Sequence, residues 1–283
     1  MLKKIALFTA LATMMGMTYA YKAEVGISYN EYDSDFNYGS EDEKLIRIDG
    51  TYYLKLVEVK NYPLNEAAFL NRSSNFNARI NKVNNTQVYY ETYPYDKYIS
   101  KDKWNQFNLG IEYFAPNSNF YINANIGHGK GEDNWKRYDY GNLVDSGIPY
   151  KYTYSTYSAE VGYLPINGLL ITAGLAGFTD ENDYSVIDPK IRAKYVTNVG
   201  KFDANFEANA RFGDDINYGF GADLYIDKTL SVGLAYSASD NSYDDDEFSI
   251  RAKKFVTPQM SVEASANMSS DADSYGLRAA YRF

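Results

Sequence analysis

Successive side chains of a β-strand point to opposite faces of a sheet, so a strand with one apolar face shows strict alternation of apolar and polar residues. This alternation is the strongest pattern in the chain and recurs from residue 22 to the C-terminus. It is clearest over residues 202–211, FDANFEANAR, where every second residue is Phe or Ala and the residues between them are polar. Each such segment predicts a strand with one apolar and one polar face.

Fourteen segments carry this pattern. They lie at residues 22–32, 44–54, 75 to before Pro94, 107–113, 120–126, 157–163, 168–178, 190–195, 202–211, 218–224, 230–236, 248–256, 260–266 and 274–283. Short connections such as N-V-G-K, I-D-K-T and T-P-Q alternate with longer ones, and an even strand number returns both ends of a barrel to one side. We therefore predict an all-β fold, a transmembrane antiparallel β-barrel of about 14 strands.

The N-terminal residues have the pattern of a cleaved signal peptide. Lys3 and Lys4 precede an apolar core, and Thr18-Tyr19-Ala20 forms a cleavage site. A short membrane anchor is the alternative, although this core is shorter than the roughly 20 residues that span a bilayer. We expect a signal peptide at residues 1–20 and a single-domain barrel at residues 21–283.

The composition agrees with an exported barrel and excludes several other classes. The chain has 30 Tyr and 15 Phe, and tyrosine suits a membrane interface because its ring is apolar and its hydroxyl polar. It has no Cys, so disulfides and thiol chemistry are excluded. The formal net charge of −9 argues against nucleic-acid binding. After the leader, no apolar run approaches the roughly 18 residues of a membrane-spanning helix.

Four regions depart from the alternation. After Pro63, the apolar spacing within residues 55–74 predicts a short helix in a long turn on the periplasmic side. Residues 130–149 have mixed charge and no period, which predicts the longest loop. Tyr150, Tyr152 and Tyr154 have the opposite phase to the segment that follows, which indicates a β-bulge. The acidic residues 33–43 predict a turn region.

Five segments carry distinctive motifs: G-T-Y-Y-L-K (50–55), P-L-N-E-A-A-F-L-N (63–71), R-A-K-Y-V (192–196), Y-G-F-G-A-D-L-Y (218–225) and L-S-V-G (230–233). These segments resemble the putative-porin family of Gram-negative outer membranes. The last strand is also similar to the closing strand of outer-membrane barrels, with Tyr281 and Phe283 at the positions that the assembly machinery reads.

The resemblance implies a fourteen-stranded barrel in the outer membrane that passes water and small hydrophilic solutes. It implies no catalytic motif and no cofactor or metal. The expected partners are outer-membrane lipid, lipopolysaccharide, the barrel assembly machinery and the permeating solutes, with the chain acting as a monomer. By analogy with porins whose longest loop folds inward, Trp135, Lys136 and Arg137 are candidates for a constriction loop.

Charges on the polar faces would create a field inside such a pore. Lys190, Arg192 and Lys194 form a basic row. The polar face of the next segment carries Asp203 and Glu207, so neighbouring strands would place opposite charges across from each other. The predicted pore-lining residues are Arg47, Asp49, Arg79, Glu112, Glu160, Lys190, Arg192, Lys194, Asp203, Glu207, Arg211, Asp223, Arg251, Lys253, Glu263, Arg278 and Arg282.

Other interpretations remain open at this point. The charges could pair and fill a closed structural barrel, or the loops could make the chain an adhesin. Acidic loops could bind divalent cations that bridge lipopolysaccharide phosphates, although their spacing does not match an EF-hand. An outer-membrane hydrolase would need the single histidine, His128, which has no G-x-S-x-G motif beside it. A soluble β-sandwich is the alternative fold.

Overall fold

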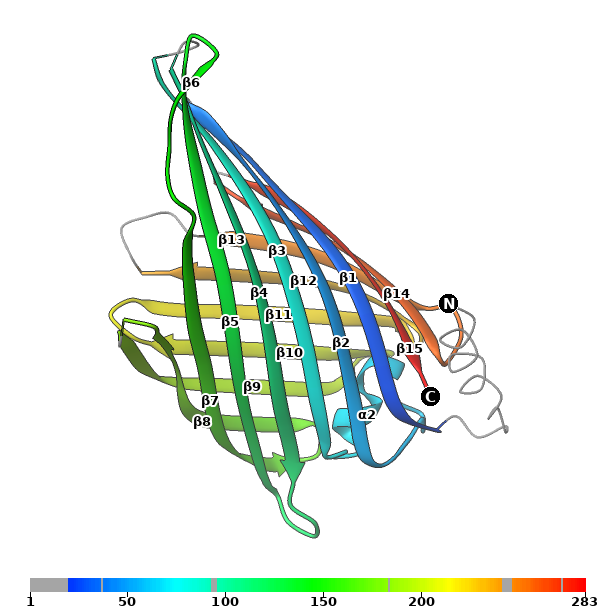
Figure 1. Cartoon of the computed structure of the whole chain (residues 1–283). Helices are drawn as coiled ribbons and strands as arrows, with labels where there is room; N and C mark the ends of the chain where they lie inside the picture. The colour runs from blue at the N-terminus through cyan, green and yellow to red at the C-terminus, as the bar shows by residue number, and fades with distance from the viewer. Residues whose placement is uncertain (1–19, 37, 93–95, 183, 241–245, 271) are drawn as a thin grey trace, which may run out of the picture.

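A computed structural model describes residues 20–36, 38–92, 96–182, 184–240, 246–270 and 272–283. In this part of the chain the strands form one antiparallel sheet that closes on itself (Figure 1). The sheet order runs from β4 through β1 and β15 to β7 and β5, and pairing of β4 with β5 completes the ring. Fourteen described strands form the wall, as predicted, and a short additional strand, β6, pairs with β5 alone.

The strand bounds are as follows: β1 Ala20–Phe36, β2 Gly39–Glu58, β3 Asn75–Thr92, β4 Asp96–Phe114, β5 Phe120–Asp139, β6 Asn142–Ser146, β7 Tyr150–Ile166, β8 Leu169–Asp180, β9 Ser185–Val199, β10 Phe202–Phe212, β11 Ile216–Asp227, β12 Leu230–Ser239, β13 Glu247–Phe255, β14 Met260–Ser269 and β15 Asp273–Arg282. Two short helical turns, η1 Leu64–Glu66 and α2 Ala67–Leu70, interrupt the β2–β3 connection. The predicted signal peptide, apart from Ala20, lies outside the described residues.

The outer face of the wall carries the apolar half of the alternation. Exposed Val, Ile, Leu, Phe and Tyr side chains follow one another at every second position, as in Tyr52, Leu54 and Leu56 of β2. Such a band suits contact with lipid, while the polar residues between them face inward. No helix within the described residues has the length and apolar character needed to cross a membrane.

The wall has a tall side and a short side. Strands β1 to β5 and β7 have 17 to 20 residues, whereas β10 to β15 have 9 to 12. A tilted strand crosses a bilayer in roughly 9–11 residues, so the tall side extends well beyond it. Figure 1 shows this extension at the end opposite the C-terminus, with β6 near its tip.

The acidic region at residues 33–43 is mostly strand and not the expected turn. β1 continues to Phe36 and β2 begins at Gly39, with Asp33 paired to Asp42 and Asp35 to Ser40. The prediction was wrong because both faces are polar here, above the lipid-facing band, so no apolar alternation marks the strands.

The expected loop at residues 130–149 is also largely strand. β5 runs to Asp139 and pairs with β4 as far as Asp96, and β6 then folds back on it through the turn at Tyr140 and Gly141. Trp135, Lys136 and Arg137 therefore belong to the wall, and the Trp135 ring stacks on Tyr98 with centroids 5.4 Å apart. The loop prediction was wrong because a connection of this length satisfies its backbone hydrogen bonds best by strand pairing.

The expected bulge near Tyr150 is absent from the described β5–β7 pair. Pairing is continuous from Asp133–Tyr150 to Phe120–Tyr163. The phase change instead places Tyr152 and Tyr154 on the inner face, where their rings lie over Gly131 and Gly129. A Cβ at either glycine would overlap the tyrosine ring, so the missing side chain gives the ring its place.

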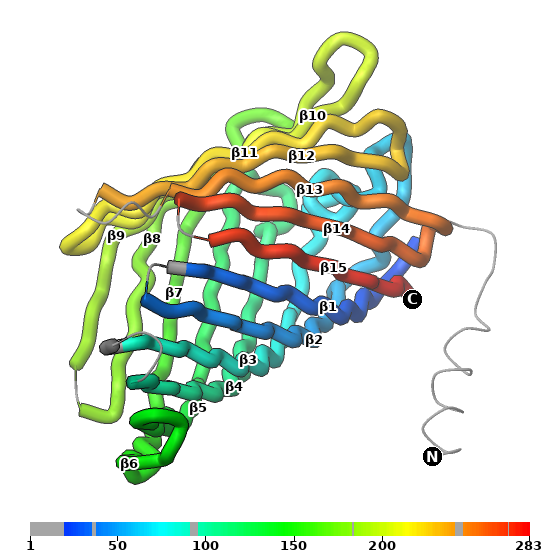
Figure 2. Tube along the Cα trace, turned by 90° about the horizontal axis from the view of Figure 1, so that it is seen from above, coloured from blue at the N-terminus to red at the C-terminus, as the bar shows by residue number. Residues whose placement is uncertain are grey.

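The two ends of the chain close the ring. In Figure 2, β15 runs beside β1, and the register pairs Glu24 with Arg282 and Tyr32 with Ser274. The Phe283 carbonyl accepts a hydrogen bond from the Lys22 amide at 2.6 Å, and the Phe283 amide donates to the Ala23 carbonyl at 2.9 Å. The last ten residues therefore pair with the first strand and close the barrel.

Candidate functional site: the plugged periplasmic end of the lumen

The β2–β3 connection folds across the end of the barrel that carries the C-terminus (Figure 1). Pro63, with φ −53°, precedes η1, and the helical turns place Leu64 so that its amide donates to the Lys228 carbonyl at 2.8 Å. Lys228 lies in the β11–β12 turn, on the far side of the ring from β2. We call residues 59–74 the plug, because the segment crosses the lumen and contacts the opposite wall.

Glu66 is the polar anchor of the plug. Its side chain is 1% exposed, and its Oε1 accepts a hydrogen bond from the Tyr225 hydroxyl at 2.5 Å. Its Oε2 lies 2.9 Å from Nζ of Lys194, which also reaches Glu207 at 2.9 Å. A buried carboxylate is tolerated when it is paired and hydrogen-bonded, and here β9 and β11 provide both contacts.

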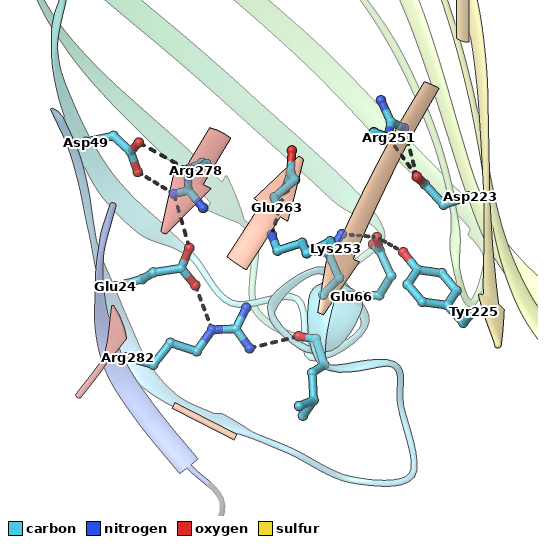
Figure 3. Close-up of polar contacts among 12 residues, drawn as sticks. Glu24, Asp49, Glu66, Asp223, Tyr225, Arg251, Lys253, Glu263, Arg278 and Arg282 are labelled. Atoms are coloured by element: carbon cyan, nitrogen blue, oxygen red, sulfur yellow. Dashed lines mark hydrogen bonds and ion pairs between the residues drawn. The ribbon is translucent and has the colours of Figure 1, made fainter. Parts of the chain in front are cut away.

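Arg282 anchors the plug on the side of the closing strand. Its Nη1 donates to the Leu64 carbonyl at 2.9 Å, and its Nε donates to Glu24 at 2.6 Å (Figure 3). The guanidinium carbon lies 4.4 Å from the ring centroids of both Tyr21 and Phe255. This combination of fork-shaped donation and ring stacking requires arginine, because a lysine ammonium provides neither.

Apolar contacts secure the remaining sides of the plug. Ala67 packs in a cluster with Tyr21, Tyr53 and Val57, at the base of β1 and β2. Phe69 packs against a second cluster formed by Phe114, Tyr121, Leu164 and Leu170. Arg72 then donates to the Ser118 carbonyl and to Asn119 Oδ1, each at 2.9 Å, which ties the plug to the β4–β5 turn.

Two polar cavities remain beside the plug. One of about 200 Å³ is lined by residues that include Tyr121, Glu112 and Arg192, and one of about 240 Å³ by residues that include Asp223 and Lys253. Asn65, Glu66, Lys194 and Glu207 line both, so the Glu66–Lys194 contact borders both cavities. Cavities of this size and polarity have room for several water molecules.

The inward charges pair along the wall. Glu160 contacts Lys190 and lies 3.1 Å from Arg192, so these two bases pair with an acid on β7, while the β10 residues opposite them are Arg211 and Asn209. Across β9 and β10, Lys194 and Glu207 form the opposite-charge pair that the sequence predicts. Elsewhere Arg251 binds Asp223 through two hydrogen bonds of 2.7 and 2.8 Å, and Arg278 lies 2.7 Å from Asp49 (Figure 3).

The structure places the predicted pore-lining residues on the inner face, opposite the exposed apolar side chains. The cavities beside the plug are lined by Glu112, Arg192, Lys194, Glu207, Asp223, Arg251, Lys253 and Glu263, and Arg282 contacts the plug itself. Arg211 instead pairs with Asp188 at 2.7 Å, and Asp203 with Lys228 at 2.6 Å. Of the three residues expected in a constriction loop, Trp135 and Arg137 share the inner-face phase of β5 and Lys136 has the outer. Their roles in permeation stay predictions.

Sequence reasoning missed the residues that hold the plug. Glu66 was part of a segment assigned to a periplasmic helix, without any role in the lumen. Tyr225, Tyr121 and Asn205 are inward, buried and polar, but they are uncharged, so the pattern of charges on the polar faces does not point to them. The sequence feature that could have indicated the role of Glu66 is P-L-N-E-A-A-F-L-N, in which one acid lies among apolar residues in a turn.

Comparison with known proteins identifies the family. The family model described as "Putative general bacterial porin" matches residues 1–283. The chain belongs to this porin family. No curated protein matches the chain.

Solved structures show the same barrel. The outer membrane protein Omp33 of Acinetobacter baumannii is 24% identical, with a TM-score of 0.65 over 94% of this chain and 100% of that one. The toluene transporter TodX of P. putida is 6% identical, with a TM-score of 0.55 over 97% of this chain and 92% of that one. These likenesses support the fold, and membership of the family makes the protein an outer-membrane channel barrel.

Membership of this family makes the protein a transport protein. His128 lies on the outer face of β5, exposed, with Nδ1 3.2 Å from the Ser155 hydroxyl oxygen. Among the described residues, no group of three or more His, Cys, Asp or Glu side chains is arranged to hold a metal ion.

Proposed function

We propose that this porin is a passive channel for water and small hydrophilic solutes, and that the plug sets its size limit. The observation that carries the proposal is the pair of polar cavities that both border the Glu66–Lys194 contact of the plug. A lumen lined by paired charges favours polar solutes over apolar ones, since only polar solutes can replace the water that solvates those charges.

The many anchors of the plug imply a narrow passage at rest. Four separate parts of the wall hold it: the β11–β12 turn, β9 with β11, the closing strand, and the β4–β5 turn. A largely closed barrel with little conductance is therefore the second candidate. In both candidates the plug controls permeation. They differ in whether solutes pass while the plug is bound to the wall.

The experiment is swelling of liposomes that contain the purified protein, with uncharged solutes of graded size. The proposed channel admits glycerol-sized solutes in the wild type, and a variant lacking residues 63–71 admits larger ones. Swelling by the deletion variant alone favours the closed barrel. Failure of both proteins to admit any solute, although both are folded, overturns the channel proposal.

A display role for the tall side is compatible with conduction. The wall formed by β1 to β5 and β7 extends beyond the bilayer and presents exposed side chains such as Tyr140 and Ile148. Binding of cells or phage by a barrel that conducts nothing would favour the adhesin alternative. We also propose that the chain acts as a monomer and enters the membrane through the assembly machinery, which reads Tyr281 and Phe283.

A further inference from the structure

Lysines gather on the outer face of the tall side. On β3, β4, β5 and β7, the outward positions above the apolar band carry Lys82, Lys97, Lys101, Lys103, Lys130, Lys136 and Lys151. Among the described residues of these strands above that band, Glu132 is the one acid on the same face. We call these lysines the lysine face; it is basic although the whole chain has a formal charge of −9.

The strand register fixes the height of the lysine face. Ile80 and Phe107 are paired, outward and about half exposed, and they end the continuous apolar band of these strands, while an isolated apolar pair, Val88 and Ile99, follows further up. The next outward row pairs Lys82 with Asn105 and Asn105 with Lys130. Outward positions on one strand repeat every two residues, roughly 6.6 Å, so the lysines begin one such step above the apolar band.

Further basic rows follow at the same spacing. Lys103 pairs with Glu132, which pairs with Lys151, and the row above contains Lys101. The side chains of Lys82, Lys101, Lys103, Lys130 and Lys151 are all exposed. The single interposed carboxylate neutralises only part of this charge, so two to three rows just outside the apolar band are net positive.

The lysine face lies where the lipid headgroups of the outer leaflet would contact the barrel. The lysine face is at the end opposite both chain ends, which is the outer side for a bacterial barrel. The outer leaflet of a Gram-negative outer membrane consists of lipopolysaccharide, and its lipid A headgroup carries phosphates directly above the acyl chains. Lysine ammonium groups are strong partners of phosphate, and basic residues beside an anionic headgroup layer bind it additively.

We infer that the lysine face binds the phosphates of lipid A and holds lipopolysaccharide against β3, β4, β5 and β7. The site is specific to one side of the barrel. On β1 and β2 the outward positions at this height are mixed, since Lys44 lies 3.2 Å from Glu31 and 2.8 Å from Asp42. Lipid A binding through direct lysine contacts differs from the cation-bridged binding considered for the acidic loops, because it needs no divalent ion.

The test titrates the detergent-solubilised porin with diphosphoryl lipid A in the presence of a chelator, and follows the temperature at which the folded band is lost on a gel. Binding to the folded state raises that temperature. We expect a rise with diphosphoryl lipid A and none with phosphate-free lipid A or with inorganic phosphate alone. The triple variant Lys82→Gln, Lys103→Gln, Lys130→Gln should bind at least about tenfold more weakly.

The matched control replaces three exposed lysines at the periplasmic end, Lys55→Gln, Lys60→Gln and Lys201→Gln, and should keep wild-type lipid A binding. Equal stabilisation of the wild type by phosphate-free lipid A, or undiminished binding by the triple variant, overturns the inference. The comparison of diphosphoryl with phosphate-free lipid A uses the wild-type protein alone, so it does not depend on the folding of any variant. Liposome swelling should be unchanged in the triple variant, so a failure here is distinct from a failure of the channel proposal.

Discussion

The hydroxyl of Tyr225 donates a hydrogen bond of 2.5 Å to the buried carboxylate of Glu66, across 159 residues of chain. This contact joins the middle of the β2–β3 connection to the inner face of β11. The contact helps to hold this connection across the lumen as a plug.

Tyr225→Phe should loosen the plug and widen the range of solutes that pass. The substitution keeps the ring but leaves the Glu66 carboxylate without its shortest hydrogen bond, at a cost of about 1–3 kcal/mol for a buried group. Liposome swelling should therefore accelerate for the larger solutes of a graded series. Tyr236→Phe, which alters an exposed outward tyrosine bonded to Asp246, is the control. An unchanged size limit in Tyr225→Phe would mean that the contact does not hold the plug.

Lys194→Met should destabilise the barrel more than Tyr225→Phe does. Lys194 lies 2.9 Å from both Glu66 and Glu207, and its loss leaves two facing carboxylates without their shared cation. Removing one partner of a buried charge cluster costs roughly 3 kcal/mol or more. The free energy of unfolding in urea measures the effect. Adding Glu66→Gln to Lys194→Met should recover part of the loss; strictly additive losses would show that the two residues are not coupled.

Arg282→Lys and Arg278→Lys should have different consequences, although both arginines contact Glu24. Arg282 also holds the Leu64 carbonyl and stacks between two rings, so its replacement should increase cleavage of residues 59–74 by added protease and raise permeability. Arg278 pairs with Asp49 and makes no hydrogen bond or ion pair with the plug within the described part of the chain, so its variant should keep the wild-type cleavage rate. Similar cleavage in both variants would contradict this assignment.

Replacing Tyr281 and Phe283 with serine should impair assembly before it changes any pore property. The two rings pack with centroids 4.8 Å apart beside the seam that Phe283 closes with Lys22 and Ala23. The measurement is the fraction of protein in outer membranes that keeps the compact, heat-modifiable gel mobility. Tyr275→Ser changes an outward, exposed tyrosine at the other end of β15 and should assemble normally. Normal assembly of the double variant would remove the proposed assembly signal.

The alternation of apolar and polar residues determined the strands of this protein and the face on which each side chain lies. A strand's two-residue period is a property of the backbone, so residues 202–211 and 274–283 already show which side chains face the lumen and which face lipid. The strand number, the closing pair of strands and the opposition of Lys194 and Glu207 follow from the same period applied along the chain. The seam between β1 and β15 was predictable because a barrel must pair its first and last strands.

The tertiary structure decided what the alternation could not encode. Residues 33–43 and much of 130–149 form strands without an apolar face, because above the bilayer there is no lipid to select one. Glu66 becomes a lumen residue only when the closed ring brings β9 and β11 opposite the β2–β3 connection, and Arg282 becomes a plug anchor only when the last strand meets the first. Contacts between such distant residues depend on closure of the barrel, and no local pattern in the sequence records them.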